Sequence, residues 1–457
     1  MVEMGASLLA VLFTCALVPE AALPASPPRV DTGATRSALG LAEAVAEARA
    51  HQPQLLGARA TTEGMRARAD QLRAPLLPQL NATLSYQRTT ANFVARPGSV
   101  PTQFMNSSRE PSIESFDFFS GGLTLSQYIW DFGQTTGRWR AAQANAEAQA
   151  QSERSLELSV AAAVRTAYFT ARAQKALVQV ARDNLANQDK HFTQVQGFVQ
   201  AGTRPSIDLS QARADRANAR VQVIAAENNY AIAKAQLNQA MGVERDTDYE
   251  VQDEALPAVP GEEQGAAALT DEALAQRPDV QGLLKQLRAQ ELLLSASKGG
   301  YGPSLLASAS ATEAGTSLTA LTWNLSASLT LNWGLFQGLL TLSQVREARA
   351  NVAAIKAQQA TLRNQIRLEI DQARLQVRSA REMLAAAGEV VASARERRRL
   401  AEARYQTGVG SIIELADAQL EGKQFAAAIP HYTAAIAMQQ RLGGNEPLVA
   451  WCSAGLA

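Results

Sequence analysis

The stretch LTWNLSASLTLNW, residues 321–333, alternates strictly between apolar side chains and small polar ones. A period of two places successive side chains on opposite faces of a β-strand, so this segment predicts a strand with one apolar and one hydrophilic face. At about 3.3 Å per residue it would extend roughly 40 Å, much longer than a typical strand of a globular protein. Trp323 and Trp333 stand near the two ends of its apolar face. Membrane-spanning strands carry aromatic girdles at these levels, so we predict that this strand crosses a bilayer.

Three further segments show the same alternation, at about residues 78–88, 117–130 and 303–313. The alternative is an amphipathic sheet in a soluble sandwich, which also has one apolar face. Four strands do not close around a lumen, because about eight are needed to enclose even side chains. If these strands cross a membrane, several chains must therefore share one barrel.

Very long runs of good helix formers lie between the strands. Residues 139–201 contain no proline and a single glycine, and the same holds for residues 345–407. Each run predicts a helix of roughly 95 Å at 1.5 Å per residue, a length typical of coiled-coil-like packing. Return helices are predicted over residues 206–241 and 411–442.

The second half of the chain repeats the first at an offset of 206 residues. Gly202 corresponds to Gly408, and the Leu-Thr-Leu triplet at 123–125 corresponds to the one at 329–331. Self-similarity of this kind indicates a repeated structural unit. The predicted organisation is a first repeat over 40–242, a connecting segment over 243–268, a second repeat over 269–443 and a C-terminal tail over 444–457.

Residues 7–18 form an apolar run that is followed by Pro19. The length of this run suits the core of a signal peptide and is too short to cross a bilayer, so residues 1–25 are predicted to be a signal peptide. Cys15 lies inside the run without small residues before it, which leaves lipidation as the weaker alternative. No apolar stretch of 18 or more residues follows, so we expect no transmembrane helix, and any membrane span must consist of strands.

The charge balance and the histidines point away from several classes of function. The chain carries 43 basic and 43 acidic residues, which gives no support to nucleic-acid binding. His51, His191 and His431 are scattered, without the spacing of metal ligands. A Gly-rich phosphate loop, a nucleophile elbow and paired catalytic carboxylates are all missing from the sequence. We therefore predict no enzymatic activity, no metal site and no cofactor.

Paired strands, a very long helical hairpin and their repetition behind a signal peptide resemble the TolC family of outer-membrane efflux channels. Three local motifs agree with this resemblance, APLLPQL at 74–80, RPDV at 277–280 and RYQTGVGSIIELADAQ at 404–419. The resemblance implies a mixed α and transmembrane β fold in a homotrimer, with four strands per chain in one 12-stranded barrel and the helices in a periplasmic tunnel. It also implies a passive exit duct for tripartite efflux or type I secretion. Such a duct lies in the outer membrane, in contact with its lipid, and docks onto a periplasmic adaptor and an inner-membrane pump.

The family also implies a function for two acidic residues. Carboxylates that follow the second-repeat turn ring the narrow end of the tunnel in the family, and they match Glu414 and Asp417. Residues three apart share a helix face, and threefold symmetry would assemble them into a ring that attracts cations. The alternative is that they are ordinary acids at a helix N-terminus, where the macrodipole favours them.

Three residues are candidates for a network that holds the tunnel tip closed. Tyr405 and Asp208 match an aromatic residue and a first-repeat carboxylate of the family's network. The arginine of the family pattern falls on Gly410, so this link is missing here. Arg204, at the corresponding place in the first repeat, is the candidate substitute.

The turns that contain Gly202 and, in the second repeat, Gly408 and Gly410 match the region where family adaptors dock. A simple connection between helices is the alternative reading of these turns. The alternative function for the whole chain is a periplasmic coiled-coil scaffold or adaptor without a channel. Such a protein would have no use for four strands with one apolar and one hydrophilic face, and a porin made of a single chain is excluded by the strand count.

Overall fold

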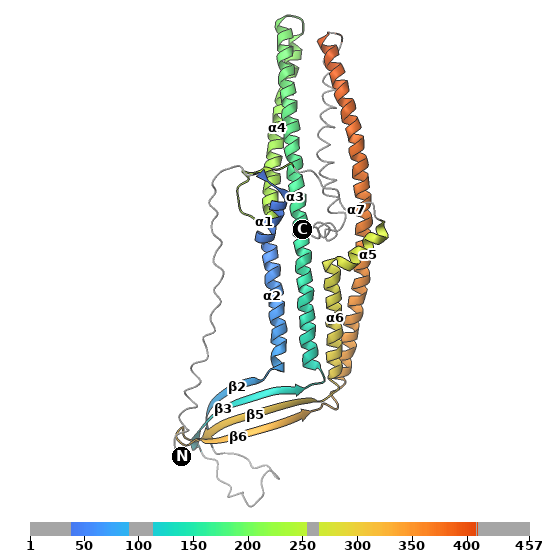
Figure 1. The fold of residues 1–457 in the computed structure, drawn as a ribbon. Helices are drawn as coiled ribbons and strands as arrows, with labels where there is room; N and C mark the ends of the chain where they lie inside the picture. The colour runs from blue at the N-terminus through green and yellow to red at the C-terminus, as the bar shows by residue number, and fades with distance from the viewer. Residues whose placement is uncertain (1–37, 91–112, 254–264, 408, 410–457) are drawn as a thin grey trace, which may run out of the picture. The chain divides into compact units, whose positions relative to one another are not determined.

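A computed structural model describes residues 38–90, 113–253, 265–407 and 409 of the chain. Four of its strands form one antiparallel sheet in the order β2-β3-β5-β6 (Figure 1). The bounds of these strands are Gln79–Thr90 for β2, Ser115–Trp130 for β3, Ser304–Gly315 for β5 and Thr322–Asn332 for β6. All four are at least as long as the 9–11 residues that a tilted strand needs to cross a bilayer. β2 and β6 are the edges of this sheet in the described part of the chain.

Helices make up most of the remaining described residues (Figure 1). They are α1 Leu41–His51, α2 Pro53–Arg73, the 3₁₀ helix η2 Ala74–Leu76, α3 Gln134–Gln200, α4 Ser206–Met241, α5 Ala266–Gln276, α6 Pro278–Gly299 and α7 Leu340–Gln406. α3 and α7 each contain 67 residues, or about 100 Å of helix. None of the helices in the described ranges combines the length and the hydropathy needed to cross a membrane.

Both long helices begin before the residues that the sequence predicted, 139 and 345. α3 begins at Gln134 because the Asp131 carboxylate accepts hydrogen bonds from the amides of Gly133, at 3.1 Å, and Thr135, at 2.6 Å. These bonds satisfy donors of the first turn that have no partner within the helix. α7 begins directly after Gly338 and Leu339, which both have positive φ, at 59° and 65°. Strand therefore passes into helix through a sharp turn in both halves of the chain.

α3 packs against α2, α4 and α6, while α7 packs against α5 and α6 (Figure 1). Small residues allow α3 and α6 to approach closely. A Cβ added at Gly137 of α3 would lie 2.8 Å from the Cβ of Ala296 in α6, and Ala289 is fully buried against the same part of α3. Close contacts of small side chains thus hold α6 against α3.

The largest core of the described chain surrounds Tyr168 of α3, whose side chain is fully buried. Its hydroxyl donates to the carbonyls of Leu39, at 3.3 Å, and Gln252, at 3.0 Å. These two carbonyls flank a short parallel pair of strands, β1 (Ala38–Leu39) and β4 (Glu250–Val251). Part of the segment predicted as a connection, 243–268, is therefore packed structure, and α5 begins inside it at Ala266.

Arg277, the first residue of the RPDV motif, links the α5–α6 turn to α7. Its guanidinium is 9% exposed and donates to Asp279 at 2.8 Å and to Glu369 of α7 at 2.9 Å. Burial alone lowers the pKa of Arg277, but the hydrogen bonds and charges of Asp279 and Glu369 outweigh it and raise the pKa overall. The motif thus fixes the second long helix to the start of α6.

α4 ends in a Schellman turn at Gly242, which has φ +73°. The Val243 amide donates to the Asn238 carbonyl at 3.1 Å, the bond that defines this turn. A Cβ at position 242 would lie 2.6 Å from the Cα of Gln52, at the junction of α1 and α2. Glycine is therefore needed here both for its backbone angle and for the space.

We predict that Gly242→Ala destabilises the protein by more than about 1 kcal/mol, because alanine adds left-handed strain and a backbone clash. Gly197→Ala is the matched control, since Gly197 lies within α3 with open space around it. It should leave stability unchanged or raise it by up to about 1 kcal/mol. Thermal unfolding followed by circular dichroism compares the two, and equal effects would contradict the assigned turn.

Candidate functional site: the two-faced sheet and the helix tips

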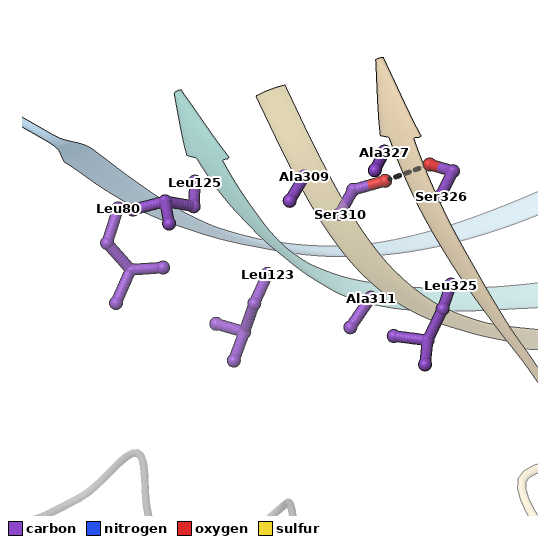
Figure 2. A pocket seen from close by; sticks show the side chains of 9 residues that line it. All are labelled: Leu80, Leu123, Leu125, Ala309, Ser310, Ala311, Leu325, Ser326 and Ala327. Carbon is purple, nitrogen blue, oxygen red and sulfur yellow. Dashed lines mark hydrogen bonds between the residues drawn. The ribbon is translucent and has the colours of Figure 1, made fainter. Parts of the chain in front are cut away.

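One face of the four-stranded sheet is apolar in the middle part of all its strands. The register brings Leu80, Leu125, Ala309 and Ala327 into one row, and Ala82, Leu123, Ala311 and Leu325 into the next. Figure 2 shows the alanines of β5 between the leucines of β3 and β6, where they leave a shallow hollow of about 460 Å³. Leu80 is 66% exposed and Leu325 is 68% exposed. A continuous apolar surface that runs over four strands is typical of a site that contacts another protein or lipid.

The opposite face of the sheet is hydrophilic and is built mainly of hydroxyl and amide side chains. Three pairs of serines on neighbouring strands share hydrogen bonds there: Ser85–Ser120 at 2.7 Å, Ser308–Ser328 at 2.8 Å and Ser310–Ser326 at 2.7 Å (Figure 2 shows the last). The sheet therefore presents one mainly apolar and one mainly hydrophilic face.

Aromatic side chains gather near both ends of the apolar face. At the end far from the helices, Trp323 is 71% exposed, and the rings of Tyr86 and Phe119 lie 5.1 Å apart. At the helix end, Trp333 follows β6 and donates its indole N–H to the Tyr301 carbonyl at 3.1 Å. The two tryptophans are ten residue steps apart, which corresponds to about 33 Å along the strand, or about 25 Å of height at a tilt of about 40°. This height matches the apolar band of a membrane barrel.

The turn at the tip of the first hairpin is a Schellman motif around Gly202, which has φ +74°. The Thr203 amide donates to the Phe198 carbonyl at 3.0 Å, and the Gly202 amide donates to Val199 at 3.0 Å. A bond of the same kind ends α7, from the Val409 amide to the Arg404 carbonyl at 3.0 Å. Its donor and acceptor stand 206 residues after Thr203 and Phe198, which is the offset of the sequence repeat.

Of the sequence-predicted tip residues, the structure describes Gly202, Arg204 and Asp208 in full. Arg204, in the turn before α4, and Asp208, in the first turn of α4, are both half-buried. Tyr405 lies in the last turn of α7, and nothing is described of its side chain. Gly408, Gly410, Glu414 and Asp417, the predicted helix 411–442 and the tail 444–457 all lie outside the described residues.

His191 is a polar group near this tip that the sequence did not single out. It is buried in α3, 7% exposed, and burial lowers its pKa below the ordinary value of 6.5. Negative charges nearby raise the pKa of His191 and so oppose this effect; they come from Asp215 and Asp208 of α4 and from Glu402 of α7. These carboxylates come from helices far apart in sequence, so no local motif marks the cluster. Within the described ranges, no group of three or more metal-ligating side chains is assembled.

The model of the outer membrane efflux protein family matches residues 44–243 and 269–441, most of the chain. The chain belongs to the outer membrane efflux protein family. The resemblance to TolC-like channels that the sequence motifs indicated is thereby confirmed.

Three comparisons illustrate the family relationship. The probable outer membrane lipoprotein SilC of Salmonella typhimurium is 22% identical over 53% of this chain and 54% of SilC, so the match spans about half of that relative. The toluene efflux pump outer membrane protein TtgC of Pseudomonas putida is 25% identical over 76% of this chain and 70% of TtgC. The crystal structure of CusC has a TM-score of 0.77 at 18% identity, covering 89% of this chain and 91% of CusC. The fold is thus that of known outer-membrane channels of this family.

We predict that acid destabilises the protein partly through His191. Because the folded state lowers the pKa of His191, the unfolded state takes up more protons as pH falls below 6.5. The contribution of neutral, buried His191 to the stability of the folded state is therefore fully present above pH 6.5. It is lost as the pH falls toward the lowered pKa of His191. His191→Gln should flatten the decline of the unfolding temperature between about pH 8 and pH 5. His51→Gln, at an exposed histidine of α1, is the control and should leave the decline unchanged; a decline as steep in His191→Gln as in the native protein would contradict the prediction.

Proposed function

We propose that this protein is a passive exit duct in the outer membrane, extending into the periplasm and serving a tripartite efflux or type I secretion system. Membership of the outer membrane efflux protein family supports this function. The observation that carries it is the four-stranded sheet, with one face apolar and exposed, the other hydrophilic, and aromatic residues at both ends of the apolar face. A periplasmic coiled-coil scaffold would keep the long helices but has no use for such a sheet.

Three chains would share one 12-stranded barrel in the proposed assembly. β2 and β6 are edge strands within the described chain, and each would pair with the other edge of a neighbouring copy. Four strands per chain and threefold symmetry give a barrel wide enough for an aqueous lumen, whereas four strands alone do not close. The apolar face would then contact lipid and the hydrophilic face would line the lumen.

Two structural repeats would supply the helical tunnel. α3 and α7 have the same length of 67 residues, and their last turns carry the same hydrogen bond at the repeat offset. The family match is also split into two segments, separated at residues 244–268. These observations support a first repeat over 40–242 and a second over 269–443, each with one long helical hairpin.

The tips of these hairpins would form the narrow entrance. We assign Glu414 and Asp417 to a ring of carboxylates there, and Asp208, Tyr405 and Arg204 to the network that holds it closed. The family resemblance of residues 404–419 supports the assignments of Glu414, Asp417 and Tyr405. Asp208 matches a first-repeat carboxylate of the same network, and Arg204 is the candidate substitute for the missing arginine.

A periplasmic adaptor would dock at the turns with Gly202, Gly408 and Gly410 and connect the duct to an inner-membrane pump. TtgC is described as part of a toluene efflux pump and SilC as a probable lipoprotein of the outer membrane. In this proposal the cargo is chosen by the pump and the adaptor, because a passive duct supplies no energy of its own.

Glu414→Ala/Asp417→Ala is predicted to weaken the preference of the channel for cations, because it removes two carboxylates per chain from the constriction. The measurement is the reversal potential in a salt gradient, with the trimer in a planar bilayer. Asp246→Ala/Asp248→Ala is the matched control, since it removes the same charge from an exposed segment after α4. An unchanged reversal potential in the first variant would exclude the carboxylate ring, while a protein that forms no channel would argue against the duct itself.

A further inference from the structure

The hydrophilic face of the sheet carries no charged side chain over the whole length of its four described strands. The register assigns each residue to a face, since partners across the ladder point to the same side. The members of this face are Gln79, Asn81, Thr83, Ser85, Gln87 and Thr89 of β2; Phe116, Phe118, Ser120, Gly122, Thr124, Ser126 and Tyr128 of β3; Ser304, Leu306, Ser308, Ser310, Thr312 and Ala314 of β5; and Thr322, Asn324, Ser326, Ser328, Thr330 and Asn332 of β6.

The charged residues of these strands are Arg88, Asp117 and Glu313, and the register places all three on the apolar face. They cluster at the end of the sheet far from the helices, where Arg88 lies 3.7 Å from Asp117 and Glu313 is opposite Trp323. This is the level at which an apolar face leaves the hydrocarbon and meets polar headgroups. Charge is thus present in the sheet but is kept off its hydrophilic face.

We infer that the strand-built part of the duct has an electrically neutral wall that passes cations, anions and uncharged solutes without distinction. This inference rests on the proposed function, because it takes the hydrophilic face to line the lumen. Any preference of the channel for ions of one sign is then generated in its helical part, not in the barrel wall.

The chemistry of the wall explains why it would not discriminate. A serine or threonine hydroxyl both donates and accepts hydrogen bonds, so it can solvate an ion of either sign. The serine pairs Ser308–Ser328 and Ser310–Ser326 occupy the middle of the wall and use only part of this capacity on each other. A fixed charge acts over about one Debye length, near 10 Å at 0.1 M salt, so charges at the helix tips do not reach these residues.

Charged thiol reagents provide the test. The two native cysteines, Cys15 and Cys452, are replaced by serine, and single cysteines are introduced by Ser310→Cys on the wall and Ala309→Cys on the apolar face. The trimer in a planar bilayer is treated with a cationic trimethylammonium and an anionic sulfonate methanethiosulfonate of similar size. At Ser310→Cys both reagents should change the current, with rates equal within about twofold once each is divided by its rate with a free thiol. Ala309→Cys should react with neither.

The positive control is Ser310→Cys combined with Ser326→Asp, its hydrogen-bonded neighbour across β5 and β6. A carboxylate this close should favour the cationic reagent by about fivefold or more. A similar preference at Ser310→Cys without the aspartate would overturn the neutral wall while leaving the duct intact. Equal reactivity at positions 309 and 310, or reaction at neither, would instead contradict the assignment of one sheet face to a lumen. Ser328→Cys replaces Ser310→Cys if that variant does not assemble.

Discussion

Two rows of backbone amides and carbonyls, along β2 and β6, have no strand partner in the described part of the chain, and this is the constraint on which the rest of the structure depends. In hydrocarbon no water is present to pair with such groups, so an open sheet edge is not tolerated there. The leucines exposed on the apolar face of the sheet match the surface that a barrel strand presents to hydrocarbon. In the proposed barrel, other copies of the chain would complete the hydrogen bonding of β2 and β6, so the sheet would lie in hydrocarbon without an open edge.

The two faces of the sheet agree with the proposed closure. A closed barrel has one surface toward lipid and one toward its lumen, and a strand with period-two alternation supplies both. The long helices are held by specific contacts, and α3 also by the core around Tyr168. α3 packs closely against α6 through small residues such as Gly137 and Ala296, and the buried hydroxyl of Tyr168 ties it to β1. α7 is held to the start of α6 by the ion pair of Arg277 with Glu369.

The strands could be predicted from the sequence because alternation is a local signal. The four predicted ranges differ from the observed strands by no more than two residues at either end. The first residues of α3 and α7 were predicted less accurately. They depend on the Asp131 carboxylate and on the positive φ of Leu339, which composition does not reveal. The grouping of carboxylates around His191 could not be predicted at all, because they belong to α4 and α7, which are far from it in sequence. The predicted tip residues Glu414 and Asp417 lie outside the described chain and remain predictions.

The most direct test of the shared barrel is the mass of the protein purified from outer membranes in mild detergent. Light scattering combined with refractive index and absorbance separates the mass of protein from that of bound detergent. The account predicts three chains per particle, because three copies of a four-stranded sheet pair all of their edges. A single chain that stays soluble without detergent would contradict the shared barrel, since the exposed apolar face of the sheet would then not lie in a membrane.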